Sequence, residues 1–242
     1  MNQTTNLVIG VVEGYNLKSM NIILILTFLI GLPTFKSDLR NIGDAKLAKE
    51  VLMAGGFPFI LSFSFDRGIE TEIQSFQYNE IRNYFNFTNE LGGKLAIGSI
   101  ALGYFISVGS GNEKLKDFSL TSLESMALAG GTTLIIKILL GRARPSTLNS
   151  PYEFKPINFD DSYQALPSGH TTIAFAWLTV FANYYGSNPI LRYGAYALAT
   201  SAAIARVYKN RHWFSDCVLG AMIGYYFGKR LSDLHLKEGG KL

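Results

Sequence analysis

Apolar segments recur along this chain, and their length constrains the fold more than any other feature. Each is rich in Gly and Ala, runs for roughly 15–20 residues and ends at a polar or proline-containing break. No segment shows the alternating pattern of a strand hairpin. We therefore expect an all-α protein, a compact bundle of about six helices. The helices are expected over residues 51–65, 91–109, 119–141, 168–185, 190–206 and 213–230.

Polar stretches between and beside these segments set the expected domain boundaries. Residues 1–35 form a signal-like or membrane-targeting segment, because the apolar run over residues 20–32 is shorter than a membrane span, which needs about 20 residues. Residues 36–50 are expected to be a polar linker, residues 51–230 the helical domain and residues 231–242 a polar tail. Residues 66–90 are polar and aromatic and are compatible with a short surface helix.

The composition lies between that of soluble proteins and that of membrane proteins. Hydrophobic residues make up 48% of the 242 residues, and the mean hydropathy is +0.17. Small residues such as Gly130-Gly131 and the pair Gly220 and Gly224 allow the close helix packing found in membranes. A tightly packed soluble bundle would share this feature, but we favour a membrane-embedded bundle.

Charge and cysteine content exclude several other classes of protein. The net charge is +4 with 17% charged residues and lacks the dense basic stripe of a nucleic-acid-binding protein, so no nucleic-acid partner is expected. The single cysteine, Cys217, excludes an intramolecular disulfide framework and a cysteine-based zinc site. Because it lies in an apolar run, we expect it to be a small buried core residue.

Two cations mark the end of the helix expected over residues 119–141. Lys137 and Arg144 are seven residues apart, so they would project from one face if the helix continued to Arg144, where Pro145 would end it. A lysine supplies a point charge, and an arginine can grip two phosphate oxygens at once. The alternative is a pair of interfacial cations whose aliphatic stems lie along apolar surface.

The segment Pro167-Ser168-Gly169-His170 lies where a loop becomes a helix. Ser168 is a natural N-cap, and the backbone N–H groups at a helix start form an anion site. Gly169 removes a side chain that would crowd the anion, and His170 follows in the first turn. Read alone, the segment could also be an ordinary capped helix with an interfacial histidine.

A second histidine, His212, precedes Asp216 by four residues and follows Arg206 by six. On a helix, a spacing of four brings an imidazole and a carboxylate together. A carboxylate that accepts from one ring nitrogen fixes the tautomer and leaves the other nitrogen free as a nucleophile. A purely structural hydrogen bond between the two side chains is the alternative.

These three segments converge if the bundle runs up and down, because alternate loops then lie at the same end. Two imidazoles, one carboxylate and three cations at one place are suited to cleaving a phosphate ester. A non-enzymatic bundle, such as a channel or transporter subunit, could use the cations as an ion path. It would not explain the spacing of His212 and Asp216 or the helix start before His170.

The three segments, in this order and spacing, resemble the signature motifs of the type 2 phosphatidic acid phosphatase (PAP2) superfamily. The patterns are Lys-x6-Arg-Pro, Pro-Ser-Gly-His and Arg-x5-His-x3-Asp, within residues 137–216. The third motif usually opens with Ser-Arg, and here Ala205 stands in the serine position. This departure removes one hydroxyl donor, and we expect weakened phosphate contact at most.

The resemblance implies a metal-independent phosphatase that needs no cofactor and works through a phosphohistidine. His212 would attack phosphorus, Asp216 would orient it, and His170 would protonate the leaving oxygen and then activate water. The implied phosphate-binding residues are Lys137, Arg144, Arg206, Ser168 and Gly169.

The apolar helices favour a lipid substrate, either phosphatidate-like or an isoprenyl diphosphate resembling undecaprenyl diphosphate. The enzyme would then contact membrane lipid, with its site on the extracytoplasmic side of the cytoplasmic (inner) membrane. If residues 20–35 were cleaved and six helices spanned, that end would face the cytoplasm, so topology stays open. The alternative is a soluble periplasmic acid phosphatase of the same superfamily that acts on small phosphomonoesters.

Overall fold

The computed structural model describes residues 35–76, 78–147 and 150–239. The chain divides into two compact units, residues 1–41 and residues 42–242. In the first unit the described part is one short helix, α3 (Phe35–Asn41). The signal-like segment expected over residues 1–35 lies outside the described residues, apart from Phe35.

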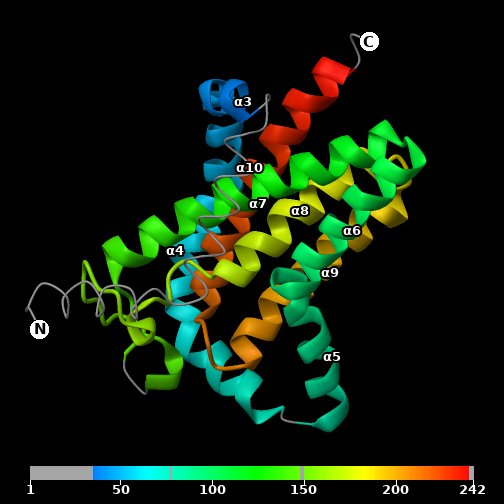
Figure 1. The fold of residues 1–242 in the computed structure, drawn as a ribbon. Coiled ribbons are helices and arrows are strands. Elements are labelled where there is room, and N and C mark those ends of the chain that lie inside the picture. Colours follow the sequence, from blue (N-terminus) through cyan, green and yellow to red (C-terminus); the bar gives the residue numbers. More distant parts are fainter. Residues whose placement is uncertain (1–34, 77, 148–149, 240–242) are drawn as a thin grey trace, which may run out of the picture. The chain divides into compact units, whose positions relative to one another are not determined.

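The second unit consists of helices joined by loops (Figure 1). Within the described residues there is no strand, only an isolated bridge between Arg142 and Phe154, so the expected all-α class is confirmed. Short 3-10 turns are η1 (Glu90–Gly92), η2 (Pro145–Thr147) and η3 (Asp161–Tyr163). The α-helices are α4 (Ala45–Ser75), α5 (Asn79–Asn89), α6 (Lys94–Ser110), α7 (Glu113–Leu140), α8 (Gly169–Tyr185), α9 (Pro189–Tyr208) and α10 (Phe214–Gly239).

Helices α4 and α10 extend into stretches that the sequence pattern predicts to be a linker or a tail. Helix α4 begins inside the expected linker, where the Asp44 side chain caps it by accepting from the Leu47 N–H at 3.0 Å. It also continues through the polar stretch after residue 65, because the carboxylate of Asp66 is buried and bonded inside the bundle. Helix α10 runs through most of the expected polar tail, where Leu231 is buried. The polar residues in these stretches therefore lie within the helices and do not mark their ends.

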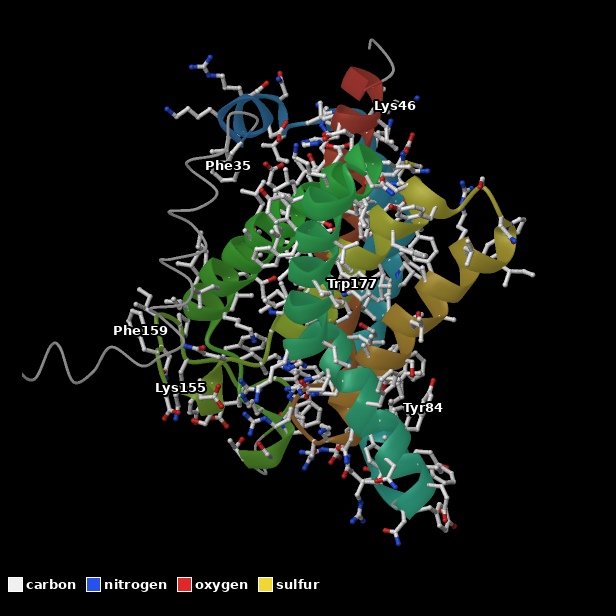
Figure 2. All side chains as sticks on the ribbon, turned by 45° about the vertical axis from the view of Figure 1, so that its right-hand side comes forward. Phe35, Lys46, Tyr84, Lys155, Phe159 and Trp177 are labelled. Atoms are coloured by element: carbon white, nitrogen blue, oxygen red, sulfur yellow. The ribbon has the colours of Figure 1, made fainter. Side chains whose placement is uncertain are left out.

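Helix α8 lies at the centre of the unit and packs against α7, α9 and α10. Its contact with α10 depends on glycine: a Cβ at Gly224 would lie 2.3 Å from the Thr172 carbonyl oxygen, and one at Gly228 would lie 2.4 Å from that of Ala176. This confirms the close packing predicted for Gly220 and Gly224, whereas an added Cβ at Gly131 would have no neighbour within 4 Å. Trp177 of α8 donates from its indole N–H to the Leu91 carbonyl at 2.8 Å and so ties α8 to η1 (Figure 2).

Apolar surface supports the prediction of a membrane protein. Within the described residues, α4 and α7 are each long and apolar enough to cross a membrane. The pair formed by residues 79–92 and α6, bent by 53°, would count as a third span if taken as one. Phe57 of α4 and Phe105 of α6 are both 71% exposed, and such a surface is suited to contact with lipid.

Candidate active site

The site forms where α7 ends, α8 begins and the loop between α9 and α10 passes. Lys137 lies in the last turn of α7, which ends at Leu140 and not at Arg144 as expected. Gly141 ends it in a left-handed conformation, with φ of 59°, and a Cβ there would collide with the Lys155 carbonyl. The chain therefore turns after α7, and Lys137 and Arg144 meet through this turn, not along one helix face.

Both of these cations are buried and partnered. The ammonium of Lys137 donates to the carbonyl oxygens of Gln164 and Ala165, the latter at 3.3 Å. The Arg144 guanidinium donates to the Asp161 carboxylate at 2.8 Å and to the Arg211 carbonyl at 3.0 Å. These contacts hold two positive charges in place beside the start of α8.

The start of α8 matches the predicted capping position but not the predicted cap bond. Ser168 is the N-cap residue, yet its side chain makes no capping bond and instead accepts from the Thr171 hydroxyl at 2.9 Å. Its backbone N–H donates to the Asp216 carbonyl oxygen at 2.9 Å. At Gly169 the nearest atom to an added Cβ would be Lys137 Cε, 3.9 Å away, so this helix end is open towards the lysine.

His170 packs against a glycine turn that the sequence analysis did not single out. A Cβ at Gly92 would lie 2.1 Å from the His170 carbonyl oxygen, and one at Gly93 would lie 3.4 Å from its ring nitrogen Nε2. Glycine at position 92 therefore permits the backbone of α8 at His170 to pack closely on η1, and Gly93 lies beside the imidazole.

His212 lies in the loop before α10, just ahead of the helix expected over residues 213–230, so helical spacing does not bring His212 and Asp216 together. The two side chains are nevertheless close, with His212 Nδ1 3.5 Å from Asp216 Oδ2. The nearer partner of Nδ1 is the Ala165 carbonyl oxygen, at 2.7 Å. Because a carbonyl can only accept, this contact places the ring proton on Nδ1 and leaves Nε2 unprotonated. Nε2 lies 3.5 Å from a terminal nitrogen of Arg144.

Arg206 brings the third cation from the end of α9. One terminal nitrogen donates to the Asn89 side-chain oxygen at 2.6 Å. Its Nε is buried and has no hydrogen-bond partner among the described residues. A buried donor without a partner is costly, and a phosphate oxygen would satisfy it.

The three cations also determine the electrostatics of His212. Burial holds the pKa of this imidazole well below its usual value, and the positive charges of Lys137, Arg206 and Arg144 lower it further. The ring is therefore neutral around pH 7 and available as a nucleophile.

A set of buried polar residues that the sequence pattern does not indicate lies behind the site. Arg142, fully buried, donates to the carboxylates of both Asp66 and Asp216 and to the Ser215 hydroxyl. An acidic residue inside an apolar span was the available signal, because such residues are commonly functional. The helix predicted over residues 51–65 ends just before Asp66, so the sequence pattern assigns this carboxylate no function.

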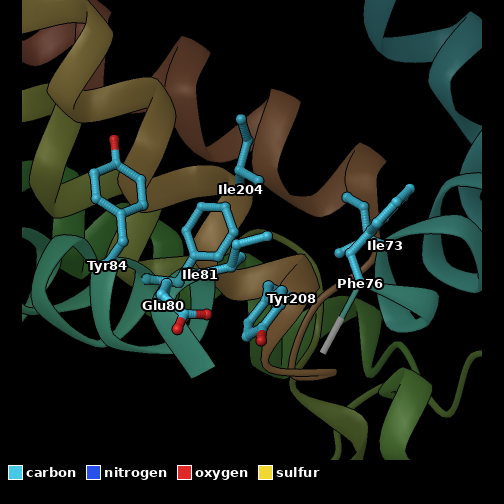
Figure 3. Close-up of a pocket in the computed structure, with 8 residues that line it drawn as sticks. Ile73, Phe76, Glu80, Ile81, Tyr84, Ile204 and Tyr208 are labelled. Carbon is cyan, nitrogen blue, oxygen red and sulfur yellow. The ribbon is translucent and has the colours of Figure 1, made fainter. Parts of the chain in front are cut away.

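An apolar pocket of about 520 Å³ lies between the end of α4, helix α5 and the end of α9 (Figure 3). Ile73 and Phe76 line it from the α4 side, Tyr84 from α5, and Ile204 and Tyr208 from α9. It contains none of the predicted site residues, but Arg206 lies on α9 between two of the residues that line it.

Comparison with known proteins identifies a family. The family model described as the PAP2 superfamily matches residues 118–239, which include every predicted site residue. The chain is 37% identical over 117 residues to a lipid A 1-phosphatase of Porphyromonas gingivalis, covering 47% of this chain and 23% of that protein. It is 28% identical over 105 residues to a lipid A 1-phosphatase of Rhizobium johnstonii, covering 43% and 42%. The chain thus matches less than half the length of these relatives.

Two solved structures share the fold. Aquifex aeolicus LpxE superposes with a TM-score of 0.54 at 21% identity, covering 72% of this chain and 95% of that chain. A transmembrane PAP2-type phosphatidylglycerolphosphate phosphatase from Bacillus subtilis gives a TM-score of 0.54 at 18% identity, covering 76% and 96%. At these identities the likeness concerns the fold alone.

Proposed function

The chain belongs to the PAP2 superfamily, and from this premise we propose that it is a phosphatase that removes phosphate from a lipid through a covalent phosphohistidine. One observation carries the proposal: His212 Nδ1 lies against the Ala165 carbonyl while Nε2 faces Arg144. This leaves the ring lone pair directed towards the cations that would hold a phosphate.

In the first step, His212 Nε2 attacks phosphorus, so that the Nε2–P bond forms and the bond from phosphorus to the lipid oxygen breaks. Burial and the positive charges of Arg206 and Lys137 lower the pKa of His170 to about 3, and the negative charge of a bound phosphate raises it again by offsetting those cations. In that complex His170 donates a proton to the departing oxygen, and the lipid leaves as an alcohol. The ring of His212 becomes positive in this step. Asp216, 3.5 Å from Nδ1, and the Ala165 carbonyl stabilise that charge.

In the second step, water replaces the histidine. His170, now neutral, takes a proton from water as its oxygen attacks phosphorus, and the Nε2–P bond breaks to release inorganic phosphate. The phosphoryl oxygens carry the developing charge in both steps. We assign them to the side chains of Lys137, Arg144 and Arg206 and to Ser168 and the Gly169 N–H at the start of α8.

The favoured substrate class is a lipid phosphate, with the 1-phosphate of lipid A as the first member to test. The exposed apolar faces of α4 and α6 and the pocket beside α9 support an amphiphilic substrate. The names of the relatives support lipid A in particular. An isoprenyl diphosphate and a small water-soluble phosphomonoester are the competing substrates.

The test is phosphate release by purified protein in detergent. The panel holds lipid A 1-phosphate, phosphatidate, undecaprenyl diphosphate and p-nitrophenyl phosphate, each assayed with the wild type and with His212→Ala. We expect a lipid to exceed p-nitrophenyl phosphate in kcat/KM, and His212→Ala to lose activity on all substrates. A wild-type protein that prefers p-nitrophenyl phosphate would support the periplasmic acid phosphatase instead.

We also propose that the protein lies in the cytoplasmic membrane with its site on the extracytoplasmic side. Phe159, in the loop between α7 and α8, is 74% exposed and close in sequence to Asp161 of the site. The variant Phe159→Cys in intact cells should react with a membrane-impermeant maleimide. The native Cys217 is buried and serves as the internal control. Labelling only after the membrane is opened would place the site in the cytoplasm.

A further inference from the structure

A buried ionic cluster behind the site joins α4 to the first turn of α10. Asp66 is fully buried. Its Oδ2 accepts from Arg142 Nη2 at 2.6 Å and from the Ser215 hydroxyl at 2.6 Å, and its Oδ1 accepts from the Ser215 N–H at 2.8 Å. Both carboxylate oxygens are therefore engaged, although Asp66 lies far from every sequence motif.

Arg142 connects Asp66 to Asp216, the carboxylate beside His212. Its Nη1 donates to Asp216 Oδ1 at 2.5 Å, while its Nε donates to the Pro151 carbonyl at 2.8 Å. The guanidinium also lies over the ring of Phe63, 4.6 Å from its centre, which excludes water from one side. Asp66 and Asp216 thus share a single buried cation.

Because Arg142 binds two carboxylates, it occupies only one oxygen of Asp216 and leaves the other available to face His212. An isolated arginine and aspartate tend to pair through two parallel hydrogen bonds, which would occupy both oxygens of the carboxylate. Here Asp66 takes Nη2, so Arg142 holds only Oδ1 of Asp216. Oδ2 accepts from the Trp213 N–H at 2.8 Å and faces His212 Nδ1 at 3.5 Å.

The net charge of the cluster also indicates that Asp66 supports Asp216. Two carboxylates and one guanidinium leave a net charge of −1 beside a ring that becomes positive when it attacks phosphorus. If Asp66 were neutral, Arg142 would cancel the charge of Asp216, and the positive ring would lose its nearest counter-charge.

We propose that Asp66 is a positioning residue, which acts through Arg142 to hold the Asp216 carboxylate towards His212 and to preserve its charge. The inference rests on the proposed function of His212 as the nucleophile. Asp66 touches neither the substrate nor the reacting atoms.

A double-mutant cycle tests the proposal with the best lipid substrate of the panel. Asp66→Asn, nearly identical in shape, should lower kcat by about 10- to 100-fold, as loss of groups that orient a functional side chain commonly does. KM should change by less than about threefold, because the phosphate-binding cations are untouched. Ser62→Ala alters another buried polar residue of α4, whose hydroxyl donates to the Phe59 carbonyl of the same helix. It is the matched control and should keep wild-type kcat.

The decisive comparison uses the Asp216→Asn background under single-turnover conditions. If Asp66 acts through Asp216, the double variant should be no slower than Asp216→Asn alone. If Asp66 only supports the fold, the two losses should multiply, and this result would overturn the proposal. Wild-type kcat in Asp66→Asn would overturn it as well. Binding of vanadate by each variant shows that the site is folded.

Failure of this inference can be told apart from failure of the proposed function. An inactive wild type, or an active His212→Ala variant, would remove the proposed function. An active wild type with an inactive His212→Ala variant and a fully active Asp66→Asn variant would remove only the role of Asp66.

Discussion

The imidazole nitrogen Nδ1 of His212 lies 2.7 Å from the carbonyl oxygen of Ala165, closer than to any carboxylate. A backbone carbonyl is held by the fold and cannot donate, so it fixes the ring tautomer without help from Asp216. The tautomer and the counter-charge of the nucleophile are therefore supplied by different groups.

This separation predicts a modest effect for Asp216→Asn. Where a carboxylate alone sets the tautomer of a catalytic histidine, the amide change costs about 10⁴-fold in kcat. Here Ala165 still fixes the ring, and only the counter-charge is lost, so we expect a loss of about 10- to 100-fold. Steady-state kinetics on the best lipid substrate measure it. A loss as large as that of His212→Ala would show that the carbonyl contact is not sufficient.

The loss of rate caused by removing His170 is predicted to be larger for a poorer leaving group. His170→Ala should strongly slow release of a lipid alcohol, because that oxygen needs a proton to depart. With p-nitrophenyl phosphate, whose leaving group needs no proton, the rate of the first step in His170→Ala should return close to that of the wild type. The product should then appear as a single burst, because hydrolysis of the phosphoenzyme still needs the base. Equal rates on both substrates, with no burst, would contradict this role.

The lowered pKa of His212 gives a prediction with a definite sign. Because the pKa lies well below 6.5, the neutral nucleophile persists as the pH falls through 6.5, and kcat/KM should not lose half its value there on account of this ring. Lys137 is the foremost of the positive charges that lower it, after burial. Removing this charge in Lys137→Met should raise the pKa and move the acid limb to higher pH. The substrate is the same in both profiles, so its own titration cancels from the comparison.

The apolar pocket is predicted to receive an acyl chain of the substrate. Ile204→Arg places a charge in its wall and should lower kcat/KM on a long-chain lipid by about 10-fold, since a charge placed against apolar chain is poorly solvated. Activity on p-nitrophenyl phosphate should be unchanged. Ile190→Arg, at the other end of α9 and 79% exposed, is the matched control. An equal loss on both substrates would show that the substitution disturbs the fold, and it would contradict a role of the pocket in binding an acyl chain.

The predicted convergence of the three motif segments could be read from the sequence because it depends on loop order. Lys137, His170 and His212 lie on loops or helix ends that alternate along an up-and-down bundle, and the structure brings them to one end. The placement of Arg144 and of His212 could not be read in the same way. Gly141 and the loop before α10 turn the chain where helical spacing had been assumed.

The groups that orient the site residues could not be predicted from the sequence for a different reason. Asp66 lies on α4 beyond residue 65, where the change to polar residues predicts that the helix ends. Its partners are separated from it by 76 residues or more. The carbonyl of Ala165 and the glycines of η1 act through the backbone, which a residue pattern does not reveal. Side-chain chemistry was therefore predictable, and the contacts that orient it were not.

In the proposed mechanism, His212 carries the phosphoryl group between the two steps. The most direct measurement is rapid quenching of the enzyme with a ³²P-labelled lipid phosphate, followed by peptide mapping. We expect label on His212 that survives alkali and is lost in acid, as a phosphorus–nitrogen bond requires, and no label in His212→Ala. Turnover without any labelled protein, or label on another residue, would contradict it.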